Sequence, residues 1–80
     1  MNDLRQLRHF VALAEHGHFA RAAEAVNLSQ PALSRSIQAL ESQLGCSLLD
    51  RHSRGFSLTA HGRLVLEHAQ RLLAGSRALS

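Results

Sequence analysis

One stretch of about twenty residues constrains the fold of this chain more than any other part. Residues 19–40 read FARAAEAVNLSQPALSRSIQAL, which is two short helical patterns separated by a turn of three or four residues. At about 100° of rotation per residue, each pattern has one apolar face. The first face holds Phe19, Ala22, Ala23 and Val26, and the second holds Leu33, Ile37, Leu40 and Leu44. Because so short a connection favours a steep crossing of the two helices, the stretch predicts a helix-turn-helix.

The residues between the two patterns indicate where one helix ends and the next begins. Asn27 tolerates a left-handed backbone and can terminate the first helix. Ser29 can accept hydrogen bonds from the unpaired backbone N–H groups at the start of the second helix. Pro31 suits the first turn, because its missing N–H would have no partner there. We therefore expect the second helix to span residues 30–44.

The outer face of this second helix carries hydrogen-bonding side chains of moderate length. Its residues are Pro31, Ser34, Arg35, Gln38 and Ser42. Gln can pair with adenine, Arg with guanine, and Ser with several base edges or with a phosphate. These are also ordinary surface residues, so from this face alone a simple solvated surface is an equal alternative.

The run AAEAVNLSQPALSRSIQALESQLGCSLLDR, followed by SLTAHG, resembles the amino-terminal domain of LysR-type bacterial transcriptional regulators. The resemblance covers nearly the whole chain, and LSQPALSRSIQALESQLG is its most specific part. It implies a mainly α fold, namely a winged helix-turn-helix with a three-helix core and a two-stranded β wing, followed by a long dimerisation (linker) helix. Two residues depart from the family pattern. Leu49 replaces a usual phenylalanine, which we expect to be a core substitution, and His61 replaces a small residue that would pack, so the last helix is expected to start slightly differently.

The resemblance also implies sequence-specific binding to double-stranded DNA. The second helix of the motif would enter the major groove with its amino end first, and the dimer would read an interrupted palindrome. The wing arginines would contact the minor groove or the DNA backbone. The predicted DNA-binding residues are Ser29, Gln30, Pro31, Ala32, Ser34, Arg35, Gln38, Arg51 and Arg54.

Apolar residues around a polar tip predict the wing itself. Gly45 supplies the left-handed position that closes the preceding helix. Two brief strands are then expected around the tip at residues 51–55; their apolar residues are Leu48, Leu49, Phe56 and Leu58. Asp50 would repel a phosphate, so we expect it either to pair with Arg51 or Arg54 or to cap another group.

The first residues of the chain predict a scaffold helix over residues 3–17. Apolar side chains repeat there at helical spacing, with Asn2 or Asp3 as a cap and Gly17 as a stop. The stripe consists of Leu4, Leu7, Phe10, Val11 and Ala14. Arg5 and Arg8 are more simply solvated than bound to phosphate. His18 stands where the family often has a capping hydroxyl, so the next helix is expected to be poorly capped.

Thr59 is expected to cap a long final helix, which divides the chain into a winged helix-turn-helix at residues 1–58 and a linker helix at residues 59–80. This helix has more apolar surface than one small domain can cover, which favours a homodimer about a twofold axis. The predicted dimerisation residues are Leu64, Val65, Leu66, Ala69, Leu72 and Leu73, with Leu79 extending the surface. Contact with another domain is the alternative. In the resembled family the helix leads to a carboxy-terminal domain that binds a small-molecule effector, and that domain is outside these 80 residues.

Composition agrees with DNA binding and excludes several other classes. All nine basic residues are arginine, and residues 29–80 supply the whole net charge of +3. The absence of Trp and Tyr argues against a stacking platform for single-stranded nucleic acid. No signal peptide or membrane span is recognisable, so a cytoplasmic protein is expected. The lone Cys46 cannot form an internal disulfide and is better explained as a small core residue.

The six histidines do not form a recognisable metal or catalytic pattern. Neither the pair His16 and His18 nor the pair His61 and His68 has the extra ligands that would close a tetrahedral site. We therefore expect no metal, no cofactor and no enzymatic activity. Two rival functions are retained. A protein-interaction module predicts no salt-dependent DNA affinity, and a metal-responsive repressor predicts stoichiometric uptake of zinc or copper.

Overall fold

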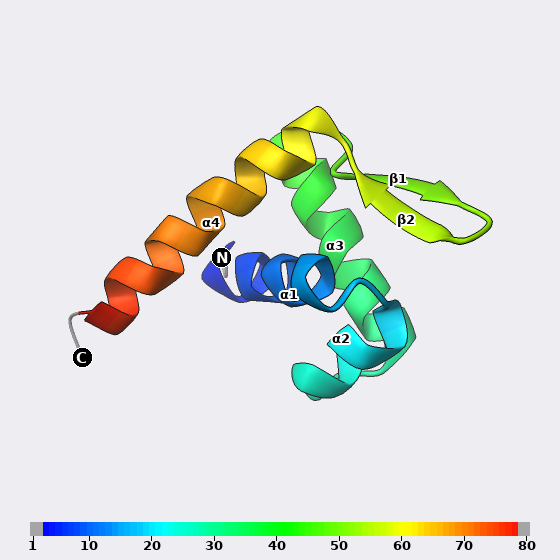
Figure 1. Ribbon diagram of the computed structural model, residues 1–80, viewed down its shortest axis with the longest axis horizontal. Helices are drawn as coiled ribbons and strands as arrows, with labels where there is room; N and C mark the ends of the chain where they lie inside the picture. The colour runs from blue at the N-terminus through cyan, green and yellow to red at the C-terminus, as the bar shows by residue number, and fades with distance from the viewer. Residues whose placement is uncertain (1–2, 79–80) are drawn as a thin grey trace.

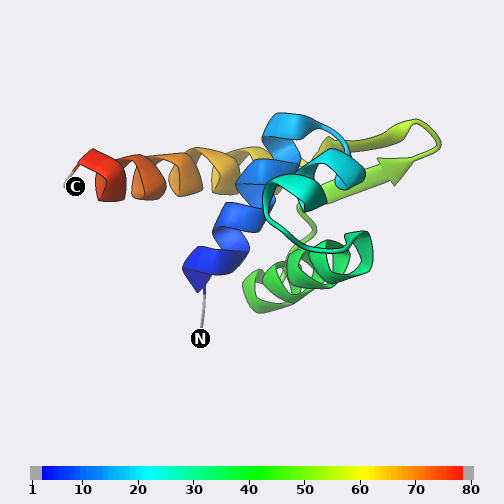
Figure 2. The ribbon, with the colours of Figure 1, turned by 90° about the horizontal axis from the view of Figure 1, so that it is seen from below.

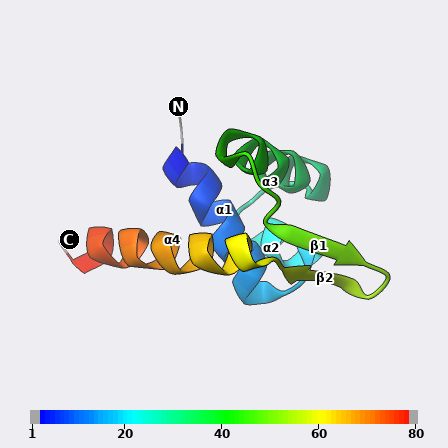
Figure 3. The same ribbon diagram turned by 90° about the horizontal axis from the view of Figure 1, so that it is seen from above.

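The computed structural model describes residues 3–78 and contains four helices and a two-stranded antiparallel sheet within them. The elements are α1 (Asp3–His16), α2 (Phe19–Ala25), α3 (Gln30–Leu44), β1 (Leu49–His52), β2 (Gly55–Leu58) and α4 (Ala60–Ala78) (Figure 1). The first three helices form the body, while the β hairpin and α4 project to opposite sides (Figures 2 and 3). The predicted fold class is therefore confirmed. The proposed Asn2 cap and Leu79 lie outside the described residues.

The helix ends fall where local signals place them. Asn27 has a φ of 60° and follows α2, while Gly45 has a φ of 72° and follows α3. Ser29 caps α3, because its Oγ accepts a hydrogen bond from the backbone N–H of Ala32 at 3.2 Å. His18 precedes α2 and makes no side-chain capping bond. All four features match the sequence-based expectations.

The core lies where α1, α2 and α3 meet the start of the hairpin. Its buried residues are Phe10, Leu13, Ala22, Ala23, Leu33, Ile37, Leu40, Leu48 and Leu49. Leu49 is only 6% exposed, which confirms that it is a core substitution for the usual phenylalanine. Two members of the predicted stripes are exposed instead, since Leu4 lies in the first turn of α1 and Leu44 in the last turn of α3. Helical periodicity continues through such terminal turns even where no neighbouring element covers them.

The hairpin is tighter than the sequence indicated. Arg51 pairs with Phe56 and His52 pairs with Gly55, so the turn contains only Ser53 and Arg54 instead of the predicted tip at residues 51–55. Because side chains alternate between the two faces of a strand, one face of the hairpin carries Leu49, Arg51, Phe56 and Leu58. Three of these four residues are apolar, and this face packs toward the body.

Thr59 joins the hairpin to α4 with two hydrogen bonds. Its Oγ1 accepts from the backbone N–H of Gly62 at 2.9 Å and donates to the carbonyl of Ser47 at 2.6 Å. The expectation that His61 occupies a packing position is wrong, because His61 is exposed in the first turn of α4. The close approach belongs to Gly62, which is buried and faces the backbone carbonyl of Leu48. A side chain larger than Ala is therefore tolerated at position 61.

Candidate nucleic-acid interface

The structure brings the residues predicted on the second motif helix together on the outer side of α3. Ser29, Gln30, Pro31, Arg35 and Gln38 are exposed, and Ala32 and Ser34 are half-buried. The opposite side of the helix is inserted into the core through Leu33, Ile37 and Leu40. The core therefore fixes which side of α3 is presented to a partner.

The amino end of α3 can also bind a group that accepts hydrogen bonds. The capping bond uses the Oγ of Ser29 as an acceptor, so its O–H remains able to donate. Backbone N–H groups in the first turn of a helix add donors and a partial positive charge at the same place. A phosphate group matches these features.

The two wing arginines have different surroundings. Arg54 lies in the two-residue turn and is exposed. Arg51 reaches back to the body, where its Cζ lies 5.0 Å from the ring centroid of Phe19. Its Nη2 donates to the Oγ of Ser34 at 3.5 Å. A cation–π contact at such an exposed place contributes about 0.5–1 kcal/mol, which is enough to bias the guanidinium toward Phe19 at the start of α2.

Phe19 and Phe56 complete this junction between the wing and the helices. Their ring centroids are 5.6 Å apart and the rings are inclined at 74°, which is an edge-to-face contact. Asp50 lies on the other face of the hairpin, opposite Ser57. Across the described residues it forms no ion pair with Arg51 or Arg54, so the predicted pairing is wrong. Strand alternation explains this, because Asp50 and Arg51 face opposite ways.

Two residues that hold the interface together were missed by sequence reasoning. An Oε2 of Glu41 on α3 accepts hydrogen bonds from the backbone N–H groups of Leu48 and Leu49, at 2.8 and 3.2 Å. The Nδ1 of His9 on α1 lies 2.7 Å from the Oγ of Ser36 on α3. Neither contact follows a local sequence pattern, and no signal short of the tertiary fold could have found them.

The ring of His9 is half-buried on α1, in the same helix as Arg5. Burial lowers the pKa of His9 below 6.5, and the positive charge of Arg5 lowers it further. The surroundings of His9 between α1 and α3 therefore disfavour its protonated form.

Five of the six predicted dimerisation residues divide into two groups. Val65 and Leu66 pack against the core and Ala69 is completely buried within its own chain. Leu64 and Leu72 are 59% and 55% exposed. The surface of α4 that can meet another molecule is therefore narrower than the sequence suggested.

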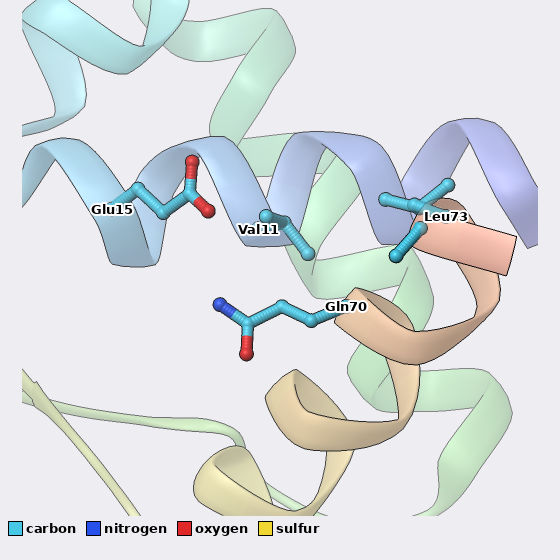
Figure 4. A pocket seen from close by; sticks show the side chains of 5 residues that line it. Val11, Glu15, Gln70 and Leu73 are labelled. Carbon is cyan, nitrogen blue, oxygen red and sulfur yellow. The ribbon is translucent and has the colours of Figure 1, made fainter. Parts of the chain in front are cut away.

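Leu73 has a third kind of surrounding. It lines a pocket of about 270 Å³ between α1 and α4, together with Val11, Glu15, Gln70 and Ala74. In Figure 4 the side chains of Val11 and Glu15 on α1 lie across this space from Gln70 and Leu73 on α4.

The described residues can also be searched for a metal site and for a membrane-spanning helix. Within residues 3–78, no three His, Cys, Asp or Glu side chains gather closely enough to hold a metal ion. None of the helices in this part combines the length and apolar content that crossing a membrane requires. Cys46 is half-buried against the core.

Most of the chain matches a known protein family. Residues 4–63 match the family described as "Bacterial regulatory helix-turn-helix protein, lysR family". The chain belongs to the LysR family. This match includes α1, α2, α3, the hairpin and the first turn of α4, so the helix-turn-helix and the wing are family features.

Curated LysR-family relatives are transcriptional regulators and not enzymes. The chain is 87% identical over 79 residues to the SDS degradation transcriptional activation protein of Pseudomonas sp. (strain ATCC 19151), covering 99% of this chain and 26% of the relative. It is 50% identical over 74 residues to the HTH-type transcriptional regulator XapR of Escherichia coli (strain K12), covering 92% of this chain and 25% of the relative. The chain thus spans about a quarter of the length of these relatives.

Solved structures of LysR-family proteins share the same fold. The complex of the BenM DNA-binding domain with catB site 1 DNA superposes with a TM-score of 0.90 at 42% identity, covering 95% of this chain and 85% of that one. The complex of the CbnR DNA-binding domain with DNA gives a TM-score of 0.83 at 46% identity, covering 94% of this chain and 92% of that one. Vibrio fischeri DarR in complex with DNA gives 0.86 at 39% identity, covering 94% and 26%.

Proposed function

We propose that this chain is the DNA-binding part of a LysR-family transcriptional regulator and that it recognises specific sequences in double-stranded DNA. The observation that carries the proposal is the outer side of α3, where hydrogen-bonding side chains are exposed directly opposite a buried apolar side. The DNA complexes of similar LysR-family domains support it.

The amino-terminal half of α3 is proposed to enter the major groove. Gln30, Ser34 and Arg35 are then placed to reach base edges, since Gln matches adenine and Arg matches guanine. Pro31 and Ala32 offer apolar surface to a thymine methyl group, and Gln38 lies further along α3, toward the edge of the contact. Ser29 and the first turn of α3 are proposed to hold a phosphate.

The wing supplies a second contact through Arg54. An arginine at the turn of a projecting hairpin can enter a narrow minor groove, where the electrostatic potential is most negative, or can bind the adjacent phosphates. Arg51 is retained at the interface, where it contacts Phe19 and Ser34. The major-groove and minor-groove contacts together would fix the register of the domain on DNA.

A homodimer is the proposed binding unit. Two copies of α4 would pack through the exposed Leu64 and Leu72 and would place two α3 helices on an interrupted palindrome. The site of action would be the bacterial cytoplasm. A small-molecule effector would bind outside these residues, in a further domain of the intact regulator. The intact regulator would also be able to form higher oligomers.

The decisive experiment selects duplexes from a random pool and then measures fluorescence anisotropy with selected and random DNA across a salt series. We expect selection of an inverted repeat, bound well above random DNA, with a logarithmic salt slope of about −0.9 for each phosphate neutralised. Light scattering of the same samples would report the dimer. The proposal would be contradicted if the protein bound all duplexes with the same weak affinity and if this binding disappeared as the salt concentration rose.

Arg35 gives the sharpest variant for this test. We expect Arg35→Ala to lose about 1–3 kcal/mol of preference at one position of each half-site, because a bidentate contact to guanine would be removed. Arg71→Ala, on the exposed side of α4, removes the same charge and serves as the control. A uniform loss for all sequences with a shallower salt slope would instead identify Arg35 as a phosphate contact.

A further inference from the structure

Arg51 stands at an unusual position in the wing. Its neighbours on the same face of the hairpin are Leu49, Phe56 and Leu58, which are buried or half-buried. This face lies against the helices, since Phe56 meets Phe19 of α2 edge to face. The guanidinium of Arg51 is therefore directed toward the helix-turn-helix, whereas Arg54 lies at the outer turn.

Two contacts hold this guanidinium. The ring of Phe19 lies 5.0 Å from its Cζ. The Oγ of Ser34 accepts from its Nη2 at 3.5 Å, which is long for a hydrogen bond, so the aromatic ring is the stronger restraint on orientation. Three elements meet here, namely α2, α3 and β1, and a residue of the wing thereby contacts the DNA-facing side of α3.

The contact favours one kind of hydrogen bond from Ser34 to DNA. A guanidinium has only donors, so the Oγ of Ser34 must act as the acceptor toward Arg51. The hydroxyl proton of Ser34 is then left to donate elsewhere. In the major groove it would favour acceptors such as guanine N7 and O6, adenine N7 or thymine O4 over the amino groups of adenine and cytosine.

We propose that Arg51 is a positioning residue that holds the wing against α3 and sets Ser34 as a hydrogen-bond donor toward a base acceptor. Arg51 acts through Ser34 and does not neutralise a phosphate. This assignment rests on the proposed function. It separates the two wing arginines, leaving Arg54 as the one that faces DNA directly.

A double-mutant cycle in DNA binding tests the assignment. Arg51→Ala, Ser34→Ala and the double variant are compared on selected duplexes and on duplexes with each base of one half-site replaced. We expect Arg51→Ala to lose about tenfold in preference at a single base position, with a salt slope equal to that of the unaltered protein. In the Ser34→Ala background the same change should add almost nothing, because the two effects are coupled.

Two control variants separate positioning from charge. Arg54→Ala should make the salt slope shallower by about 0.9, as expected for a lost phosphate contact. Phe19→Leu keeps every charge but removes the ring beneath Arg51, so it should reproduce the base-specific loss. Thermal melting followed by circular dichroism confirms that each variant is folded before it is compared. The proposal would be overturned if Arg51→Ala made the salt slope shallower and lowered affinity equally for all duplexes. The same loss of affinity in the Ser34→Ala background would also count against it.

A measurement on the free protein distinguishes this proposal from the proposed function. Ring currents of Phe19 should shift the side-chain proton resonances of Arg51 in NMR spectra without DNA, and Phe19→Leu should abolish that shift. Absence of the shift overturns the role of Arg51 even if the protein binds DNA normally. If the shift is present but the unaltered protein shows no salt-dependent or sequence-dependent affinity, the proposed function fails, and the DNA role of Arg51 with it.

Discussion

Glu41 joins two parts of the proposed DNA-binding surface with one carboxylate. Its Oε2 accepts from the N–H groups of both Leu48 and Leu49, which begin the segment that leads into the wing. A charged acceptor makes such bonds stronger than those between neutral groups. At the scale of single residues, the orientation of the wing relative to α3 therefore depends on a side chain that is not proposed to contact DNA.

We predict that Glu41→Ala destabilises the domain by about 1.5–3 kcal/mol, because two part-buried N–H groups lose a charged acceptor. Urea unfolding measures the loss. Glu67→Ala is the matched control, since Glu67 is exposed and its ion pair with Arg71 is 3.9 Å long; it should change stability by at most about 0.5 kcal/mol. Similar losses for the two variants would contradict the structural role of Glu41.

His9 predicts a pH dependence of stability. Burial, and then the charge of Arg5, lower the pKa of His9 below 6.5 in the folded state. The unfolded chain therefore binds a proton more readily, and the stability contributed by neutral His9 is present above pH 6.5 and lost as the pH falls through the folded-state pKa. Urea unfolding at pH 7.5 and at lower pH should show this decline, and His9→Gln should flatten it. An unchanged slope in His9→Gln would assign the pH dependence to other groups.

At the scale of elements, the hairpin and α4 are joined by a close approach of backbones. Gly62 in the first turn of α4 is buried against the carbonyl group of Leu48. Thr59 holds the same segments together through the carbonyl of Ser47. The direction in which α4 leaves the body is thus set within its first turn.

We predict that Gly62→Ala is destabilising although alanine favours helices by about 1 kcal/mol over glycine. A Cβ at position 62 would overlap the carbonyl oxygen of Leu48, and a backbone atom cannot move aside as a flexible side chain can. Overpacking of this kind costs about 1–3 kcal/mol, so the net change should be a loss in thermal unfolding. His61→Ala, one residue earlier and exposed, should stay within about 0.5 kcal/mol. Equal melting temperatures for both variants would contradict the close approach.

At the scale of the whole molecule, the shape separates the proposed DNA contact from the proposed dimer contact. The domain measures 40 × 26 × 22 Å, and its long axis follows from α4 projecting away from the wing (Figure 3). The packed side of α4 is used by its own chain through Val65, Leu66 and Ala69. The exposed Leu64 and Leu72 on the same helix would give the proposed second copy a surface that does not compete with the core.

We predict that replacing Leu64 and Leu72 together by Gln weakens the homodimer without unfolding the domain, because both side chains are more than half exposed. Light scattering should shift from twice 8.8 kDa toward 8.8 kDa, and affinity for the inverted repeat should fall more than affinity for a single half-site. His68→Gln, exposed on the same helix, is the control. A dimer that persists in the double variant would place the contact elsewhere.

Much of the fold follows from residues that act on their near neighbours. Ser29 caps α3 through a backbone N–H three residues away, and Thr59 does the same for α4. Asn27 and Gly45 end helices by their own backbone angles. The face of α3 was predictable because Leu33, Ile37 and Leu40 recur with the helical period. Such interactions are encoded within one or two turns of chain.

The contacts that complete the site were decided by the tertiary structure. Arg51 meets Ser34 across 17 residues, and His9 meets Ser36 across 27. The sequence places Arg51 in the tip of the wing and does not identify its partner. Helical periodicity does not show that Ala69 is covered while Leu64 and Leu72 are left exposed. The sequence by itself thus determined the elements, the ends of the helices and the side of α3 that faces outward. Only the packing of elements distant in sequence decided which side chains meet, because a local pattern contains no information about what lies opposite.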